Sequence, residues 1–127
     1  MAPTTPDSHR PRILVVEDTL LIADLLADQL RDEGFDVVGP VPRVAQALAL
    51  ATAERLDGAL LDINLAGEEC FPIASALSAR GIPFAFLTGY ADSIMPPSFR
   101  DMPRLTKPFK LGDLASLLEH HFRGRGS

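Results

Sequence analysis

The chain has 127 residues, of which 46% are hydrophobic and 23% charged, a composition typical of one globular domain and not of a disordered chain. Its net charge of −5 offers no basic footprint for a nucleic-acid backbone, so we expect no nucleic-acid partner. No apolar run approaches the roughly 18 residues of a membrane helix, and residues 1–12 are too polar for a signal peptide. The single cysteine, Cys70, excludes an internal disulfide and is expected to be a packing residue. We therefore predict a cytoplasmic protein without membrane contact.

The two ends of the chain differ in composition from the rest. Residues 1–11 (MAPTTPDSHRP) are rich in proline and lack apolar periodicity, and residues 123–127 (RGRGS) are equally polar. Both are predicted to be flexible. One folded domain is expected over residues 12–122.

In the first half of this domain, short β-rich runs alternate with longer helical patterns. Strands are predicted at Arg12–Val16 and Asp36–Val41, and helices at Thr19–Glu33 and Val44–Arg55. From Ile13 onward the first strand is wholly apolar, as expected for a strand that is buried on both faces of a sheet.

The same alternation continues in the second half. Strands are predicted at Gly58–Asp62, Pro83–Leu87 and Arg104–Thr106, helices at Phe71–Arg80 and Leu111–Phe122, and a loop at Asn64–Glu69. Strands that alternate with helices imply crossover connections and a parallel sheet. We therefore predict an α/β fold in which a doubly wound, five-stranded parallel sheet carries helices on both faces.

The segment Ala91–Pro103 interrupts this alternation where a fourth helix is due. It contains three prolines and no helical stripe. Pro96 and Pro97 would each cost a helix interior roughly 3 kcal/mol. We predict at most one helical turn before Pro96, followed by an irregular, mobile loop.

Polar side chains follow the apolar strands where each strand ends: Glu17, Asp18, Asp62, Thr88 and Lys107. Parallel strands bring their C-terminal ends to one edge of the sheet, where ligands bind, so these residues are expected to meet there. Converging carboxylates repel one another unless a cation lies among them, and Mg²⁺ suits their hard oxygen atoms. A lysine and a hydroxyl beside the metal would provide a charge and a donor for a phosphoryl group.

Each of these residues also has an ordinary structural explanation. The acidic pair suits the first turn of a helix, where carboxylates are favoured. Asp62 and Thr88 suit turns, and Lys107, one of two lysines in the chain, suits a solvated loop. The occurrence of all of them at strand ends is what favours a common site.

The segments LVVED, LLDINL, FLTGY and KPF, in this order, resemble the receiver domain of bacterial two-component response regulators. The resemblance covers about Arg12 to Phe122. It implies a flavodoxin-like sheet with strand order 2-1-3-4-5. It also implies a phosphorelay function, in which a phosphoryl group passes from a phosphohistidine of a sensor kinase to the receiver, and signalling by protein contact or onward phosphotransfer.

The resemblance implies a set of metal ligands. Glu17 and Asp18 match the acidic pair that helps to hold Mg²⁺. Asp62 matches the aspartate that contacts the metal and accepts the phosphoryl group. The backbone carbonyl of Asn64 matches a further protein ligand of the metal.

The resemblance also implies groups that bind the phosphoryl oxygens. Thr88 matches the hydroxyl residue that turns toward them, and Lys107 matches the lysine that pairs with them. The Lys107–Pro108 bond matches a peptide bond that is typically cis in the family, as expected for a functional turn before proline.

Some positions depart from the usual pattern of the family. Arg104 stands where an aromatic switch residue precedes the lysine by three positions. Tyr90 is a candidate substitute, although it could equally be a rim aromatic packed on the loop, and Gly89 lies between it and Thr88. The F-x-T-G-Y run and the altered fourth helix together resemble a subgroup of stand-alone receivers.

The expected partner is a sensor histidine kinase or a histidine phosphotransfer protein, which would contact Thr19, Leu20 and Pro108. The last helix and the altered segment would form an output face. An enzyme of the aspartyl-phosphate phosphatase type is disfavoured, because Asn64 stands where such enzymes need a second acid. The chain is expected to catalyse only its own phosphorylation and slow dephosphorylation. A receiver fragment of a larger regulator or hybrid kinase is a further alternative.

Overall fold

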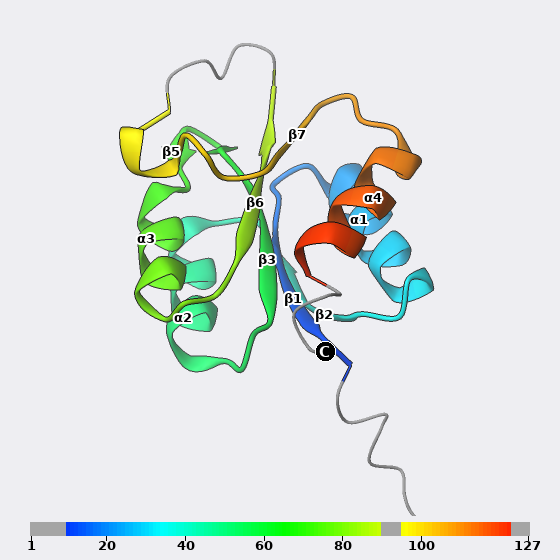
Figure 1. Ribbon diagram of the computed structural model, residues 1–127. Helices are drawn as coiled ribbons and strands as arrows, with labels where there is room; N and C mark the ends of the chain where they lie inside the picture. The colour runs from blue at the N-terminus through cyan, green and yellow to red at the C-terminus, as the bar shows by residue number, and fades with distance from the viewer. Residues whose placement is uncertain (1–9, 90–94, 123–127) are drawn as a thin grey trace, which may run out of the picture.

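The computed structural model describes residues 10–89 and 95–122 (Figure 1). Residues 1–9 of the arm predicted at 1–11, and the tail predicted at 123–127, lie outside the described residues. Its centre is a parallel sheet of five strands in the order β2-β1-β3-β6-β7. These strands are β1 Arg12–Val16, β2 Asp36–Val41, β3 Gly58–Asp62, β6 Phe84–Thr88 and β7 Arg104–Thr106. When only these five strands are numbered in chain order, the sheet has the order 2-1-3-4-5, which confirms the predicted topology.

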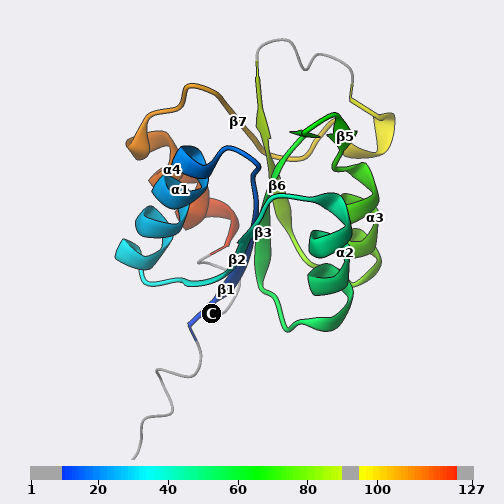
Figure 2. The ribbon, with the colours of Figure 1, turned by 180° about the vertical axis from the view of Figure 1, so that it is seen from behind.

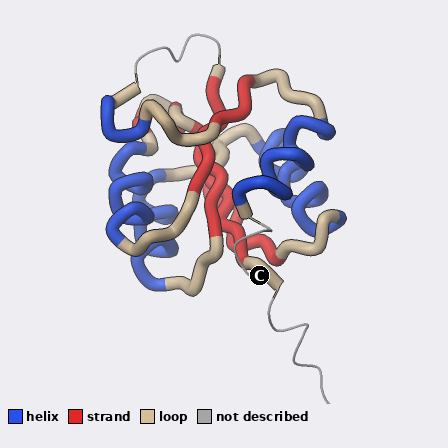
Figure 3. The backbone as a smooth tube through the Cα atoms, viewed as in Figure 1, coloured by secondary structure: helices blue, strands red, loops and turns tan. Residues whose placement is uncertain are grey.

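The helices cover both faces of the sheet, and Figure 3 shows the strands running between two groups of helices. α1 (Leu20–Asp32) and α4 (Leu111–His121) lie on one face, and α2 (Val44–Ala53) and α3 (Phe71–Ala79) lie on the other (Figures 1 and 2). None of the helices within residues 10–89 and 95–122 is long and apolar enough to cross a membrane.

The core is divided by the sheet into two hydrophobic clusters. Successive residues of β1 point to opposite faces, so that Leu14 and Val16 join the cluster under α2 and α3, whereas Ile13 and Val15 join the cluster under α1 and α4. A strand that serves two cores must be apolar at every position, which explains the uninterrupted hydrophobic runs in the sequence.

The connection from β6 to β7 differs from the prediction. In its described part, residues 95–103, it forms one turn of 3-10 helix, η2 at Pro97–Phe99, and no α-helix. The prediction of an irregular loop after Pro96 is therefore wrong at this turn. The helical turn predicted before Pro96 falls largely on residues outside the described part of the chain.

Aromatic packing explains why this turn is ordered. Phe99 is buried, and its ring stacks on Phe71 of α3 with centroids 5.9 Å apart. The same ring meets Phe84 and Phe86 of β6 edge to face, at 5.8 and 5.9 Å. Phe99 thus covers part of the sheet face where the fourth helix was due.

A second difference lies directly after β3, where a loop was predicted. Residues 64–69 form a small antiparallel hairpin of two short strands, β4 (Asn64–Leu65) and β5 (Glu68–Glu69). Its turn residues Ala66 and Gly67 have φ values of 54° and 90°. Positive φ at both central residues is what a two-residue type I′ hairpin turn requires.

Candidate functional site

The C-terminal ends of β1, β3, β6 and β7 lie at one edge of the sheet. Strand register makes the ends nearly level, because Val16 pairs with Leu61, Asp62 with Leu87, and Thr88 with Thr106. The structure therefore brings the polar residues that follow these strands to the same edge, as the topology predicted.

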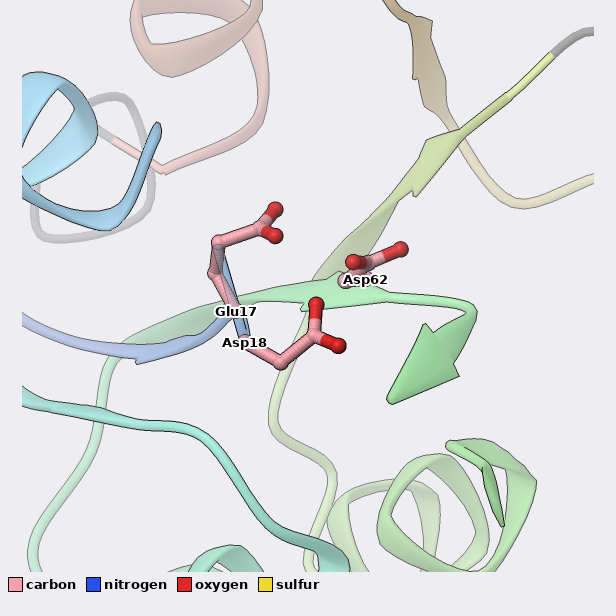
Figure 4. A group of neighbouring side chains, drawn as sticks. All are labelled: Glu17, Asp18 and Asp62. Carbon is pink, nitrogen blue, oxygen red and sulfur yellow. The ribbon is translucent and has the colours of Figure 1, made fainter. Parts of the chain in front are cut away.

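Three carboxylates meet there, as Figure 4 shows. Glu17, Asp18 and Asp62 each offer an oxygen atom, and these atoms all lie within 4.8 Å of one another. Glu17 and Asp62 are buried, whereas Asp18 is exposed. A cluster of this density is unfavourable unless positive charge lies among its members.

Lys107 provides part of that charge. Its Nζ donates a hydrogen bond to Asp62 Oδ2 at 3.1 Å and lies 2.9 Å from Glu17 Oε1. Burial lowers the pKa of the Lys107 ammonium, but its contacts with the two carboxylates outweigh burial and raise that pKa above its usual 10.5. Lys107 is therefore charged at neutral pH.

The Asp62 carboxyl is strongly perturbed. Its pKa is raised from 3.8 to about 7, chiefly by burial and further by the negative charge of Glu17, while Lys107 acts in the opposite direction. One lysine thus does not fully compensate two buried carboxylates. A further cation at this edge would favour the ionised form of Asp62.

The two carboxylate oxygens of Glu17 have different partners. Its Oε2 accepts the backbone N–H of Thr19, the N-cap residue of α1, at 3.1 Å, but neither Glu17 nor Asp18 lies in the first turn of that helix. Its buried Oε1 has only the ion pair with Lys107 and no hydrogen-bond donor among the described residues. A buried oxygen in this state is an available hard ligand, and the acidic cluster fits Mg²⁺.

The remaining predicted residues of the site lie around this cluster. Thr88 is buried at the end of β6. Asn64 begins β4; its N–H donates to Asp62 Oδ1 at 3.3 Å, and its side-chain Oδ1 accepts the N–H of Gly67 at 3.1 Å. The Lys107–Pro108 peptide bond is cis.

Of the predicted rim residues, Arg104 is not gathered into the cluster. Arg104 lies at the opposite end of β7 from Lys107, and its guanidinium donates to the Arg100 carbonyl at 2.8 Å. It lines an open groove of about 570 Å³ between β7 and α4. Gly89 directly follows β6, and Tyr90 lies outside the described residues.

One contact at the site was missed by the sequence analysis. The backbone N–H of Ala66, in the turn of the β4–β5 hairpin, donates to Asp18 Oδ2 at 2.9 Å. Any residue except proline could provide this group, so the side-chain pattern carries no signal for it.

Comparison with known proteins agrees with this geometry. A family model described as the response regulator receiver domain matches residues 13–119. The chain is 32% identical over 123 residues to the transcriptional regulatory protein PdtaR of Mycobacterium tuberculosis (strain CDC 1551 / Oshkosh), covering 92% of this chain and 60% of PdtaR. It is 38% identical over 91 residues to the DNA-binding response regulator MtrA of Mycobacterium bovis, covering 69% of this chain and 39% of MtrA. The chain thus spans only part of the length of these relatives.

Solved structures give the same result. The solution structure of SdrG from Sphingomonas melonis Fr1 is 45% identical, with a TM-score of 0.78 over 87% of this chain and 94% of SdrG. The receiver domain of the sensor histidine kinase PA1611 from Pseudomonas aeruginosa PAO1, which has a magnesium ion coordinated in its active site cleft, is 27% identical. Its TM-score is 0.75, over 93% of this chain and 99% of that domain. With the family model matching most of the chain and the strand order in agreement, the chain belongs to the receiver domains of two-component response regulators.

Proposed function

We propose that Asp62 of this receiver accepts a phosphoryl group from a phosphohistidine of a sensor kinase or phosphotransfer protein. The observation that carries this proposal is the meeting of Asp62 with two further carboxylates and Lys107 at the strand ends. Asp62 accepts a hydrogen bond from Lys107. The product of a reaction at Asp62 would therefore remain next to a fixed positive charge.

Glu17, Asp18, Asp62 and the backbone carbonyl of Asn64 are the groups that would hold Mg²⁺. The fit rests on the clustered carboxylate oxygens and on the buried Oε1 of Glu17, which has no hydrogen-bond donor among the described residues. The magnesium ion in the cleft of the related PA1611 receiver supports the same metal here. When bound, Mg²⁺ supplies positive charge to the phosphoryl oxygens during transfer.

The protein groups account for the transfer itself. An oxygen of the Asp62 carboxylate attacks phosphorus in line, the phosphorus–nitrogen bond to the donor histidine breaks, and an acyl phosphate forms. The Lys107 ammonium, already 3.1 Å from Asp62 Oδ2, binds a phosphoryl oxygen of the product. The Thr88 hydroxyl donates to another, which links the end of β6 to the state of the site.

The proposed docking face for the donor is the start of α1. Leu20 and Leu21, which follow the acidic pair and Thr19, are 76% and 80% exposed there, and Leu25 is 43% exposed one turn further on. Exposed leucines in such a group mark a protein-binding surface. Thr19 and Pro108 border the same edge and complete the proposed footprint.

The proposed output face consists of α4 and the segment that includes η2, and its partner would be reached by protein contact or onward phosphotransfer. We place the protein in the cytoplasm. Its chemistry is confined to phosphorylation and slow dephosphorylation of its own Asp62. Asn64 does not favour a phosphatase acting on other substrates, because its side chain accepts the N–H of Gly67 and is not an acid.

Intact mass spectrometry tests the proposed function. Wild type, Asp62→Asn and the exposed control Asp24→Asn are incubated with a small phosphodonor, with and without Mg²⁺. We expect one metal-dependent phosphoryl group on wild type and Asp24→Asn and none on Asp62→Asn. Equal modification of Asp62→Asn, or an unmodified wild type after incubation with a cognate phosphorylated kinase, would contradict the proposal.

A further inference from the structure

We propose that the β4–β5 hairpin is a positioning element of the metal site. In this proposal the backbone N–H of Ala66 holds the Asp18 carboxylate in the orientation that a divalent cation needs. The inference rests on the proposed function, because it takes Asp18 to be a metal ligand. It adds a residue that no side-chain motif marks.

Asp18 needs such support more than the other two acids. Glu17 and Asp62 are 2% and 5% exposed and are held by Lys107 and by backbone N–H groups. Asp18 is exposed, and Ala66 is the one hydrogen-bond donor that its carboxylate has within the described residues. A charge-assisted hydrogen bond of 2.9 Å restricts a side chain that would otherwise sample several rotamers.

The orientation of the Ala66 N–H is in turn fixed by the hairpin. Ala66 has a φ of 54°, which is uncommon for a residue with a Cβ atom and persists only where the surroundings impose it. Those surroundings are the bond from Gly67 N–H to Asn64 Oδ1 at 3.1 Å and the buried side chain of Leu65, which anchors β4 in the core.

The same hairpin contacts two acids that come from different strands. Its first residue, Asn64, donates its N–H to Asp62 at the end of β3, and its turn residue, Ala66, donates to Asp18 after β1. The hairpin therefore spans the two strand ends that the cation would bridge. Cation affinity and hairpin order are coupled, so that each strengthens the other.

Mg²⁺ titration by calorimetry tests the inference on the full chain and on three variants at position 66. Ala66→Gly keeps the N–H and accepts positive φ, Ala66→Val keeps the N–H but disfavours positive φ, and Ala66→Pro loses both. We expect Ala66→Gly to bind like wild type, and Ala66→Pro to bind about 10-fold more weakly, the usual loss when a group that orients a metal ligand is removed. Ala66→Val should lie between them.

Several results of this titration would overturn the inference. If Ala66→Pro binds Mg²⁺ as tightly as Ala66→Gly, the hydrogen bond has no positioning role. If Ala66→Val binds as weakly as Ala66→Pro, backbone conformation and not the N–H controls the site. If Asp18→Ala weakens Mg²⁺ binding but Ala66→Pro does not, only this inference is refuted. If wild type does not bind Mg²⁺, the proposed metal site is refuted as well.

A metal-free measurement keeps the test valid if Ala66→Pro does not fold. Hydrogen exchange of the Ala66 amide is followed by NMR in wild type and Asp18→Ala, both with chelator. We expect this amide to be protected in wild type and to exchange faster in Asp18→Ala, while the Cys70 amide, which donates to the Ile63 carbonyl at 2.9 Å, is unchanged. Equal exchange of the Ala66 amide in the two proteins would overturn the inference.

Discussion

Gly58, the first residue of β3, lies directly beneath the ring of Phe122. A Cβ atom at position 58 would fall 2.7 Å from Cδ1 of that ring and 3.1 Å from Cδ1 of Ile13. Phe122 follows α4 and is 1% exposed. Because Gly58 has no side chain, the ring of Phe122 can pack against the centre of the sheet. This packing anchors the end of α4.

Gly58→Ala should destabilise the domain, because the ring of Phe122 must move out of a well-packed site. Overpacking of this kind costs about 1–3 kcal/mol. The free energy of unfolding in urea measures the effect. Gly112→Ala in α4 is the matched control, since its added Cβ would meet nothing within 4 Å, and it should leave stability unchanged or raise it. Equal stability of the two variants would show that Phe122 does not depend on Gly58.

The perturbed Asp62 carboxyl predicts a pH dependence in metal-free protein. With its pKa raised from 3.8 to about 7, the folded state holds a proton that the unfolded chain has already lost, so stability falls as pH rises through this window. Lys107, whose pKa is raised from 10.5, stays charged throughout. Asp62→Asn removes the titrating group and should therefore gain stability over wild type as the pH rises from about 4 to about 7.

Urea unfolding of both proteins with chelator, at the two ends of this pH window, measures that gain. Asp24→Asn is again the control, because Asp24 is exposed on α1. A stability difference between wild type and Asp62→Asn that is the same at both pH values would contradict the assigned pKa. Mg²⁺ should abolish the pH dependence in wild type, since it favours the ionised carboxylate.

Replacing Lys107 should lower the stability of the metal-free protein and raise its affinity for a cation. Lys107→Met leaves the buried carboxylates of Glu17 and Asp62 without their positive partner, which should cost about 1–3 kcal/mol without metal. The same change removes a charge that repels a cation, so stabilisation by Mg²⁺ should increase. Thermal unfolding with chelator and with Mg²⁺ checks both effects.

Lys110→Met is the control for this experiment, since Lys110 is the other lysine of the chain and is exposed before α4. It should change neither quantity. If Lys107→Met responds to Mg²⁺ less than wild type does, the ammonium supports the cation instead of competing with it.

Phe99 should be a stability determinant although it lies in a connection without α-helix. Phe99→Ala removes the ring that packs on Phe71, Phe84 and Phe86, and truncation of a buried phenylalanine costs about 3–5 kcal/mol. Ser98→Ala, at the exposed neighbouring position, should be nearly neutral. A cost for Phe99→Ala below about 1 kcal/mol would mean that η2 is not anchored to the core.

The parts of the fold that were correctly predicted are those with a strong periodic signal. β1 and β3 are buried on both faces, so their uninterrupted apolar runs mark them with correct bounds. The strand ends then located the acidic cluster, because the C-terminal edge of a parallel sheet gathers residues that are distant in sequence. Asp62 and Lys107, 45 positions apart, meet for this reason.

The parts of the fold that were missed depend on interactions that produce no periodic pattern of hydrophobic residues in the sequence. The strands of the β4–β5 hairpin have two residues each, which is too short to alternate visibly, and Ala66 gives no hint of its positive φ. Likewise, the sequence around Pro96 correctly argued against a helix of ordinary length. It could not show that Phe99 finds three aromatic partners in α3 and β6, since that depends on tertiary packing.

Because β1 contributes to both hydrophobic clusters and leads into the acidic pair, it limits which substitutions the domain can accept. This strand supplies alternate side chains to both hydrophobic clusters and leads straight into Glu17 and Asp18. A volume change in either core displaces the backbone that carries the acidic pair, whereas the exposed leucines of α1 can be exchanged without moving it. The exposed leucines of α1 can therefore change partner choice without changing the acidic pair that carries the chemistry, although the two sets of residues lie close together in the sequence.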